Sequence, residues 1–480
     1  MNLIEVHNVH KKLSERFCLE GISFTVKQGE FVILGKDNGT GKTTLLNIIL
    51  GLDVPDSGEV KLDGCSPFDP KSKKRVGAVL QTVTPPKDIT VKEFVKLWQS
   101  YYSNSLSVEE ILSTVNLEGK HDDLFQNLSG GEKQRIYFAL AIADKPTILI
   151  VDEPSKELDG KGKKDFWGQI KQCREQGITI LMVSNESDDD NNIKALATRY
   201  ITLEWNEKDG KSKIIADKVV SLNNFTEESK NTPINSTNES QNFISMLWRQ
   251  TYVECLKLSR NRTYLLGLLL FPCMVIFLKP GEQEGKIQLL CFAGISLITF
   301  AIDRLGNVIA TERSEGWLKL LRVSPLPPTV YLSAKVLISL AILTVNLLLV
   351  LVLGAWKLGI QENLGQWLLM FFSFILGIIP FIIFGLALGY LYKPKIVNVI
   401  TGLSLPFALT TCGLPFPVSK PVQDLIAFSP FCHYGRLVMW SAGMSNDNYV
   451  SIDLLWLLWA ACIFGFLAVW AYQHDAEVQR

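Results

Sequence analysis

Two patterns in the first half of the chain carry residues suited to phosphate chemistry. The segment Ser129–Gly131 opens an amphipathic helix, and its small residues let backbone N–H groups approach a phosphate at the helix N-terminus. An apolar run, Thr147–Val151, has the length and composition of a buried strand and ends in Asp152 and Glu153. A carboxylate pair at the tip of such a strand can bind Mg²⁺ through Asp152 and polarise a water molecule through Glu153.

A glycine-rich loop with related chemistry lies nearer the N-terminus. The stretch Gly35–Thr44, GKDNGTGKTT, follows a strand predicted at Phe31–Leu34 and precedes a helix predicted over residues 43–52. Strand, glycine-rich loop and helix in this order are the context of a P-loop. In such a loop the backbone N–H groups and the helix dipole hold the β-phosphate. Lys42 then reaches the β- and γ-phosphates, and Thr43 offers a hydroxyl to Mg²⁺.

The loop departs from P-loop spacing at its first glycine. Counted back from Lys42, that glycine belongs at position 36, where the chain has Lys36, and Gly35 lies one residue earlier. Either the turn is displaced by one residue, or Lys36 adopts a conformation that glycine takes more easily. We expect the loop still to bind ATP, and we expect this departure to affect the affinity.

Together the motifs resemble those of the ATP-binding cassette (ABC) family. LSGGEKQR at 128–135 is similar to the family's signature motif, ILIVDEP at 148–154 to its Walker B motif, and Ser155–Asp159 to its D-loop. The strand Val76–Gln81 resembles the one that ends in the Q-loop glutamine. The resemblance implies an α/β P-loop ATPase domain that binds ATP and Mg²⁺.

The resemblance also implies roles for individual positions. Glu153 would position the hydrolytic water. Gln81 would contact the metal or the attacking water and transmit the ATP state to the membrane domain, and Asn185 would lie beside the γ-phosphate. Mg²⁺ would be served by Thr43, Gln81 and Asp152. The nucleotide would contact Gly35, Asn38, Gly39, Thr40, Gly41, Lys42, Thr43 and Thr44, together with Ser129, Gly130, Gly131, Gln134 and Asp159.

Two further positions depart from the family pattern. Asn185 stands where the family places a histidine, and asparagine can hydrogen-bond to phosphate but cannot carry a positive charge. Leu13 stands where an aromatic residue would stack on adenine, and Phe17 is the nearby alternative. These departures and Lys36 all lie in the Walker half of the cassette. The family's cassettes pair head to tail, so that each ATP lies between one chain's Walker half and the other chain's signature. Two alternatives follow. Either this chain's own Walker site is weak and its signature completes a stronger site on a different partner, or the chain forms a working homodimer.

The composition indicates a soluble domain followed by a membrane domain. Of 480 residues 47% are hydrophobic and the net charge is zero, so there is no basic footprint for nucleic acid. We expect a nucleotide-binding domain at 1–222, a polar linker at 223–245 and a transmembrane domain at 246–480. The N-terminus has a strand-like alternation without the pattern of a cleaved signal. The cysteines show no metal-ligand spacing; Cys412 and Cys432 could pair outside the membrane, although we favour two unpaired thiols.

The second half contains six apolar segments, with five as the alternative count. The two longest clear the roughly twenty residues that a bilayer requires. We expect the chain to cross the plasma membrane several times. The flanking Lys and Arg residues favour an orientation with the ATPase domain and both termini in the cytoplasm. The segments are Thr263–Leu278, Ile287–Ile302, Val330–Trp356, Trp367–Leu391, Ile396–Thr411 and Leu454–Tyr472.

Two connections in this half have distinctive sequences. Thr311–Pro327 is a charged turn followed by an amphipathic segment and proline, and it resembles the segment with which type-two ABC permeases dock on the cassette. The residues that match are Glu312, Arg313 and Gly316, which we interpret as the coupling element; the alternative is a basic interfacial helix. The outer loop Cys412–Asp453 is interrupted by prolines and suggests re-entrant helices.

The two halves together resemble a half-transporter of the type-two exporter family. The resemblance implies ATP-driven export of a hydrophobic or amphipathic substrate by a dimer, identical or not, embedded in membrane lipid. Almost no ionisable residue lies at mid-depth in the spans apart from Lys335 near an end, which favours an apolar cargo over an ion path. The alternative is an ATP-binding membrane regulator or sensor with little turnover, motivated by Lys36 and Asn185 and opposed by Glu153.

Overall fold

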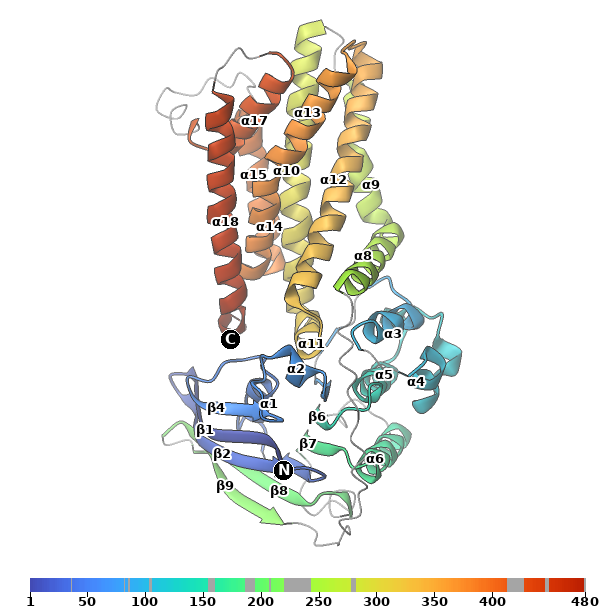
Figure 1. Ribbon diagram of the computed structural model, residues 1–480, viewed down its shortest axis with the longest axis vertical. Coiled ribbons are helices and arrows are strands. Elements are labelled where there is room, and N and C mark those ends of the chain that lie inside the picture. The colour runs from blue at the N-terminus through green and yellow to red at the C-terminus, as the bar shows by residue number, and fades with distance from the viewer. Residues whose placement is uncertain are drawn as a thin grey trace. The chain divides into compact units, whose positions relative to one another are not determined.

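The computed structural model divides the chain into two compact units (Figure 1). The first unit, the cassette, comprises Met1–Val253 together with Gly316–Tyr331, and the second, the helical unit, comprises Glu254–Glu315 and Leu332–Gln479. The structure describes residues 1–35, 37–81, 83–84, 87–102, 106–153, 160–185, 195–206, 209–219, 243–277, 282–411, 427–444 and 449–478.

A nine-stranded sheet with the order β4-β1-β2-β9-β8-β3-β7-β6-β5 forms the centre of the cassette. The pairs from β8 through β3, β7 and β6 to β5 are parallel, whereas β1 pairs antiparallel with both β2 and β4. Strands β3, β6 and β7 are buried along their whole length, which explains their continuous apolar sequences. The strands are β1 Asn2–Ser14, β2 Phe17–Lys27, β3 Phe31–Gly35, β4 Ser57–Leu62, β5 Val76–Val79, β6 Ile148–Asp152, β7 Thr179–Val183, β8 Arg199–Asn206 and β9 Lys211–Val219.

The cassette helices begin where the sequence supplies caps. Thr90, Ser107 and Ser129 each accept a hydrogen bond from a glutamate N–H three residues later, and that glutamate bonds back to the cap N–H. These helices are α1 Lys42–Ile49, α2 Pro70–Lys73, α3 Val91–Gln99, α4 Val108–Thr114, α5 Gly130–Ile142 and α6 Gly160–Glu175, with 3₁₀ turns at Glu118–Lys120 and Phe125–Asn127.

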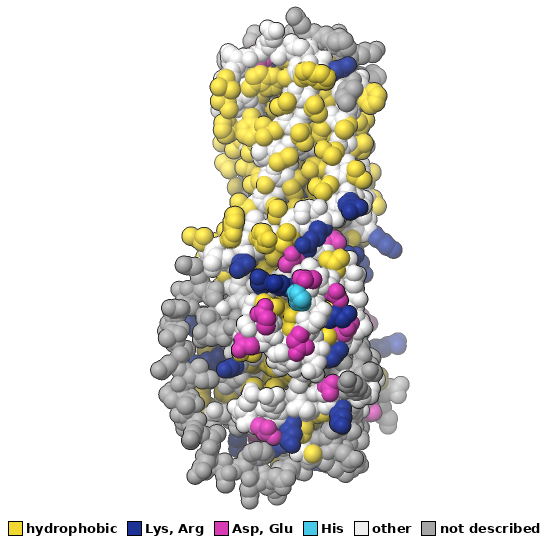
Figure 2. Space-filling view, turned by 90° about the vertical axis from the view of Figure 1, so that its right-hand side faces the viewer, with side chains coloured by type: hydrophobic (Ala, Val, Ile, Leu, Met, Phe, Trp, Pro, Cys, Tyr) yellow, Lys and Arg dark blue, Asp and Glu magenta, His cyan; other side chains and the backbone are white. Residues whose placement is uncertain are grey.

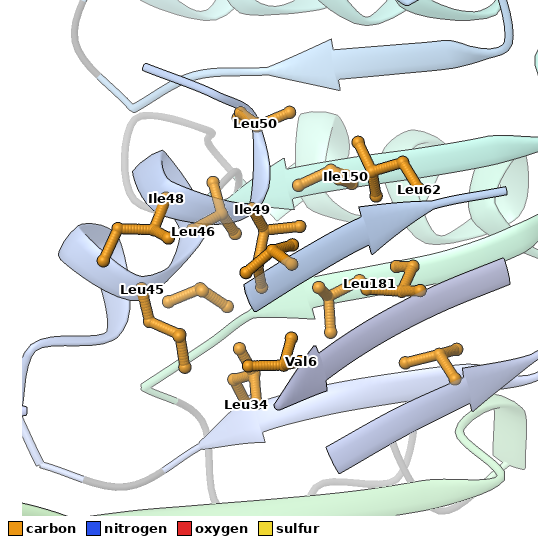
Figure 3. Packing of buried hydrophobic residues seen from close by; sticks show 14 of the residues in the cluster. Val6, Leu34, Leu45, Leu46, Ile48, Ile49, Leu50, Leu62, Ile150 and Leu181 are labelled. Atoms are coloured by element: carbon orange, nitrogen blue, oxygen red, sulfur yellow. The ribbon is translucent and has the colours of Figure 1, made fainter. Parts of the chain in front are cut away.

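One hydrophobic cluster packs α1 onto the sheet (Figure 3). Leu45 and Ile49 from α1 lie in this cluster with Leu34 of β3, Ile150 of β6 and Leu181 of β7. The ends of β3 and β6 carry the glycine-rich loop and the acidic pair. Burial of α1 therefore fixes the loop between β3 and α1 beside those carboxylates.

The helical unit is a bundle whose exposed surface carries many hydrophobic side chains (Figure 2). Four of its described helices are long and apolar enough to cross a membrane: Gly285–Ser314, Pro328–Leu358, Leu364–Leu391 and Val450–Gln473. They contain the helices α10 Glu282–Ser314, α12 Pro328–Leu358, the consecutive α13 Leu364–Gly377 and α14 Ile379–Leu391, and α18 Val450–Val478.

The remaining two predicted spans correspond to shorter helices. Helix α9, Arg262–Met274, is apolar and continues into the 3₁₀ turn Val275–Phe277, and α15 covers Pro394–Thr411. A count of six therefore stays a prediction. Two further helices, α8 Phe243–Arg260 and α17 Pro430–Ser441, complete the described part, and α17 lies in the stretch predicted to hold re-entrant helices. Cys412 lies outside the described residues, so its pairing is untested.

The predicted coupling segment forms a short helix that belongs to the cassette unit. Helix α11, Trp317–Val323, begins after Gly316, whose φ of 77° suits glycine. The Trp317 ring is 2% exposed and lies 5.6 Å from the ring of Phe94 in α3. This helix is packed on α3, and its coupling role stays a prediction, with the basic interfacial helix as the alternative.

Candidate functional site

The glycine-rich loop has the geometry that a phosphate-binding turn requires. Gly39 and Gly41 have φ angles of 80° and 87°, a region that residues with a Cβ rarely adopt, and Gly41 is the N-cap of α1. The Nζ atom of Lys42 donates to the carbonyl oxygen of Asp37 at 2.6 Å, on the inner side of the loop. Burial lowers the pKa of Lys42, although the nearby carboxylates oppose that shift.

Gly35 is required by packing at the end of β3. A Cβ atom built there would lie 1.7 Å from the hydroxyl oxygen of Tyr200 in the neighbouring strand β8. The glycine therefore admits Tyr200, which gives it a reason to stand at 35 that is independent of phosphate. Lys36 lies outside the described residues, so both alternatives for the displaced loop glycine stay open.

Asp152, at the end of β6, lies next to the first turn of α1. Its Oδ1 is 3.4 Å from the hydroxyl oxygen of Thr43. Asp152 is buried, and burial, followed by the charge of Glu153, raises its pKa from 3.8 to about 6. Mg²⁺ prefers oxygen ligands, and a hydroxyl beside a carboxylate that is costly to ionise fits such a cation. Thr43 and Asp152 are therefore suited to hold Mg²⁺.

Glu153 is held by two side-chain amides from different strand ends. Gln81 Nε2 donates to Oε2 at 2.8 Å, and Asn185 Nδ2 donates to Oε1 at 2.6 Å. The backbone of Glu153 has a φ of 43°, uncommon for a residue with a side chain, and its N–H donates to the carbonyl of Val183. The structure thus brings together the three residues predicted to be catalytic, with Asn185 in contact with the glutamate.

A cavity of about 340 Å³ lies over this loop. Both Leu13 and Phe17 contribute to it, and the Phe17 ring also stacks on Trp205, with 6.1 Å between ring centroids. Trp205, in β8, was not predicted, because it belongs to no motif. The lining residues are Leu13, Phe17, Asn38, Gly39, Gly41, Lys42, Thr43, Thr44 and Glu153. Thr40, another predicted P-loop residue, does not line the cavity; its carbonyl oxygen accepts a hydrogen bond from the Ser212 hydroxyl at 2.6 Å.

The signature residues do not line this cavity. Ser129 caps α5, and its hydroxyl lies 2.9 Å from the carboxylate of Glu132. Gly130 and Gly131 form the first turn of α5, and Gln134 is buried in the same helix. Asp159 lies outside the described residues.

The predicted coupling residues before Gly316 lie in the helical unit, where they are engaged in ion pairs. The Glu312 carboxylate is 2.9 Å from Lys257 Nζ and 2.6 Å from Lys335 Nζ, and both lysines also contact Glu254. We call Glu254, Lys257, Glu312 and Lys335 the charge quartet. Each acid contacts both bases, so the four charges balance.

Arg313 has separate partners. It donates to the carbonyl oxygen of Tyr392 at 3.0 Å and lies 3.4 Å from Asp475 in α18. Sequence reasoning missed Glu254 and Asp475, because neither lies in a motif. The sequence offered little signal: Glu254 is the one acidic residue of α8, and Asp475 lies in the polar last turns of α18.

Comparisons with known proteins agree with this architecture. A profile of the ABC transporter family matches residues 19–156, and a profile of the ABC-2 family transporter proteins matches residues 182–471. The zinc import ATP-binding protein ZnuC of Rickettsia conorii is 36% identical over 38% of this chain and 76% of its own length. The Nod factor export ATP-binding protein I of Burkholderia lata is 34% identical over 38% of this chain and 62% of its own length.

A solved cassette described as dimeric and bound to ADP and phosphate is 29% identical over 45% of this chain and 99% of its own, with a TM-score of 0.39. The chain belongs to the ABC transporter family, as a fusion of an ABC ATPase with an ABC-2 permease domain. The predicted fold class is confirmed. The chain is therefore an ATP-binding membrane protein whose ATPase is of the class coupled to transport.

Proposed function

We propose that the chain is a half-transporter that uses ATP to export a hydrophobic or amphipathic substrate across the cytoplasmic membrane. The ATPase domain and both termini lie in the cytoplasm. The ABC-2 permease match and a relative named for export support the outward direction, although the relatives also include proteins named for import. The apolar surface of the helical unit supports an apolar cargo.

The described geometry supports a division of labour in hydrolysis. Thr43 and Asp152 hold Mg²⁺, which neutralises charge on the β- and γ-phosphates when it is bound. Lys42 contacts those phosphates, and Glu153 orients and polarises the attacking water. Its carboxylate is aimed by Gln81 and Asn185, which bond to separate oxygens.

A second chain completes the site in this proposal. The Ser129–Gly131 turn opens a helix N-terminus, which suits a phosphate, yet it contributes nothing to the described lining of the chain's own cavity. A head-to-tail partner would bring its own Ser129–Gly131 turn to that cavity. Identical partners satisfy this geometry, and so does a related chain with an intact Walker half.

The observation that carries the proposal is the doubly held carboxylate of Glu153, and its removal is the test. We would reconstitute the full chain in lipid nanodiscs and measure Mg²⁺-ATPase rate, ATP binding and mass. Glu153→Gln should reduce turnover at least about a hundredfold while ATP binding persists, because binding energy comes mainly from the loop. Glu109→Gln, an exposed change in α4, is the control and should leave the rate unchanged.

The alternative function, a regulator or sensor, predicts a different outcome. It is favoured by Asn185, which gives the site no titratable switch residue. A wild-type chain that binds ATP as a dimer but shows no Glu153-dependent turnover would contradict the pump. A monomer without turnover that becomes active with a second, different chain would instead establish a heterodimeric transporter. ATP-dependent uptake of a lipophilic dye into inside-out vesicles would then test the export direction.

A further inference from the structure

Three polar side chains meet where α17 packs on α18, apart from every residue used in the proposed function. His433 and Arg436 come from α17, and Asp453 comes from the first turn of α18. His433 and Asp453 are each 3% exposed. Buried ionisable groups are costly unless they are paired, so their pairing shows what the cluster can do.

The Nδ1 atom of His433 has two competing neighbours. Asp453 Oδ1 lies 2.6 Å away and Arg436 Nη2 lies 2.9 Å away. The Nδ1 atom of a neutral imidazole carries either a proton or a lone pair. A proton there serves the Asp453 carboxylate and opposes the Arg436 N–H, whereas a lone pair does the reverse. One protonation state of the ring therefore cannot satisfy both neighbours.

The Asp453 carboxylate is shared in the same way. Arg436 Nε lies 3.3 Å from the Oδ1 atom that His433 contacts. At the far side of the imidazole, Nε2 is buried and has no hydrogen-bond partner among the described residues. The ring stacks on Trp456, with 5.0 Å between centroids and 12° between planes. A second proton on the ring would place an imidazolium over an indole face, which cation–π attraction favours.

We propose that this cluster is a proton-binding site in which protonated His433 and Arg436 compete for Asp453. While His433 is neutral, Arg436 is the cation that balances the carboxylate. A proton taken from water onto Nε2 puts two cations beside one carboxylate, and they repel each other. The Arg436 side chain is 41% exposed and that of His433 is 4% exposed, so Arg436 is the cation that can turn into solvent. Proton binding thus exchanges the counter-ion of Asp453.

The charged and titratable groups on the neighbouring helices identify His433 as the residue that would bind the proton. Cys432 is the other titratable side chain of α17 close to the cluster. The ion pair of Lys286 in α10 with Glu362 attaches to the opposite end of α17, at the carbonyl after Ser441. Helix α13 contains no charged residue, and α15 contains only Lys395, which is exposed.

Trp456 allows the exchange to be observed directly, because an imidazolium stacked on indole quenches its fluorescence. The full chain in nanodiscs, without nucleotide, would be titrated from about pH 8 to about pH 5, the range in which histidine changes charge. The difference between the wild type and Trp456→Phe isolates the signal. We expect one quenching step, which His433→Gln abolishes and His121→Gln, an exposed histidine change in the cassette, leaves in place.

The competition is tested by the direction in which the midpoint moves. Arg436→Met removes the rival cation and should raise the midpoint by about one pH unit, whereas Asp453→Asn should lower it. The Arg436→Met result decides the case even if Asp453→Asn fails to fold. A missing wild-type step, a step that survives His433→Gln, or an unchanged or lower midpoint in Arg436→Met would each overturn the proposal. The titration contains no ATP, so an inactive ATPase would leave its outcome untouched.

Discussion

The cassette and the helical unit hold their acidic groups in opposite ways. In the cassette, Glu153 accepts hydrogen bonds from the neutral amides of Gln81 and Asn185. In the helical unit, Glu312 lies 2.6 Å from Lys335, a partner of opposite charge, and both are buried. A carboxylate whose hydrogen bonds come from amides is free of an ion pair in those bonds and can attract a water molecule or a metal ion. A carboxylate held by lysines is already neutralised.

This difference predicts opposite signs for substitutions. A buried ion is stabilised by its partners of opposite charge. Its removal leaves a partner's charge buried and uncompensated, which destabilises the protein. A buried acid kept for a ligand destabilises the protein before the ligand arrives, because its ionisation is unfavourable there. Removal of a charge should therefore destabilise the helical unit and stabilise the cassette without nucleotide.

The largest effect is expected from Lys335→Met, which breaks the charge quartet. Lys335 is 1% exposed and lies 2.8 Å from Glu254 and 2.6 Å from Glu312. Its loss leaves two carboxylates that share one lysine of the charge quartet, Lys257, and should cost about 3–5 kcal/mol. Thermal stability of the full chain, followed by size-exclusion chromatography in detergent, would measure this. Lys357→Met, an exposed change at the other end of α12, is the control and should be neutral.

A double substitution distinguishes charge balance from packing in the same quartet. Glu312→Gln with Lys335→Met leaves Glu254 and Lys257 as a pair, 2.9 Å apart. The double variant should regain more than half of the stability that Lys335→Met loses. If the double variant instead lost the sum of the stabilities lost in the two single variants, the four charges would not act as a balanced set.

The opposite sign is expected from Asp152→Asn. Burial and Glu153 raise the pKa of Asp152 from 3.8 to about 6, so its ionised form is disfavoured in the folded protein. The cost of that ionisation is absent below the unfolded pKa and grows as pH rises through the folded value. Without nucleotide or metal, Asp152→Asn should stabilise the protein at pH 8 by about 2–3 kcal/mol, and by about half as much near pH 5.

Thermal unfolding of both proteins in chelator at these two pH values would measure this difference. Because the asparagine keeps an oxygen for the Thr43 hydroxyl, the comparison isolates the charge. A destabilised Asp152→Asn protein at pH 8 would show that the buried carboxylate is compensated after all, as the acids of the helical unit are.

The two regions also differ in how far sequence reasoning reached. The P-loop and the acidic pair were predicted because each is a contiguous motif at the end of a buried strand, and parallel strand ends meet at one edge of a sheet. The charge quartet was not predicted. Lys257 is one of the flanking Lys and Arg residues that were interpreted only as signs of membrane orientation, and Lys335 was interpreted as an isolated charge near a span end. Their meeting depends on how α8, α10 and α12 pack, which no local pattern encodes.

Single-residue departures were located by sequence, but their physical meaning required neighbours distant in the chain. The position of Gly35 follows from the Tyr200 hydroxyl in β8. Asn185 was predicted beside the phosphate, and its described partner is Glu153. The His433 cluster escaped notice because Asp453 lies on a different helix from His433 and Arg436 and the three residues match no motif.

The smallest effect is expected from Asn185→His, which gives Glu153 a partner that can become charged. Asn185 Nδ2 lies 2.6 Å from Glu153 Oε1, and an imidazole N–H can replace that donor. The ATPase rate should change by less than about tenfold at pH 8. Below about pH 6.5 the imidazolium should neutralise the carboxylate and add a descending step to the pH–rate profile. Asn185→Ala should lower the rate without adding this step. If the pH–rate profile of Asn185→His matched that of the wild type, a charge on the residue at position 185 would not affect Glu153. The difference between neutral and charged partners would then not matter for ATPase activity.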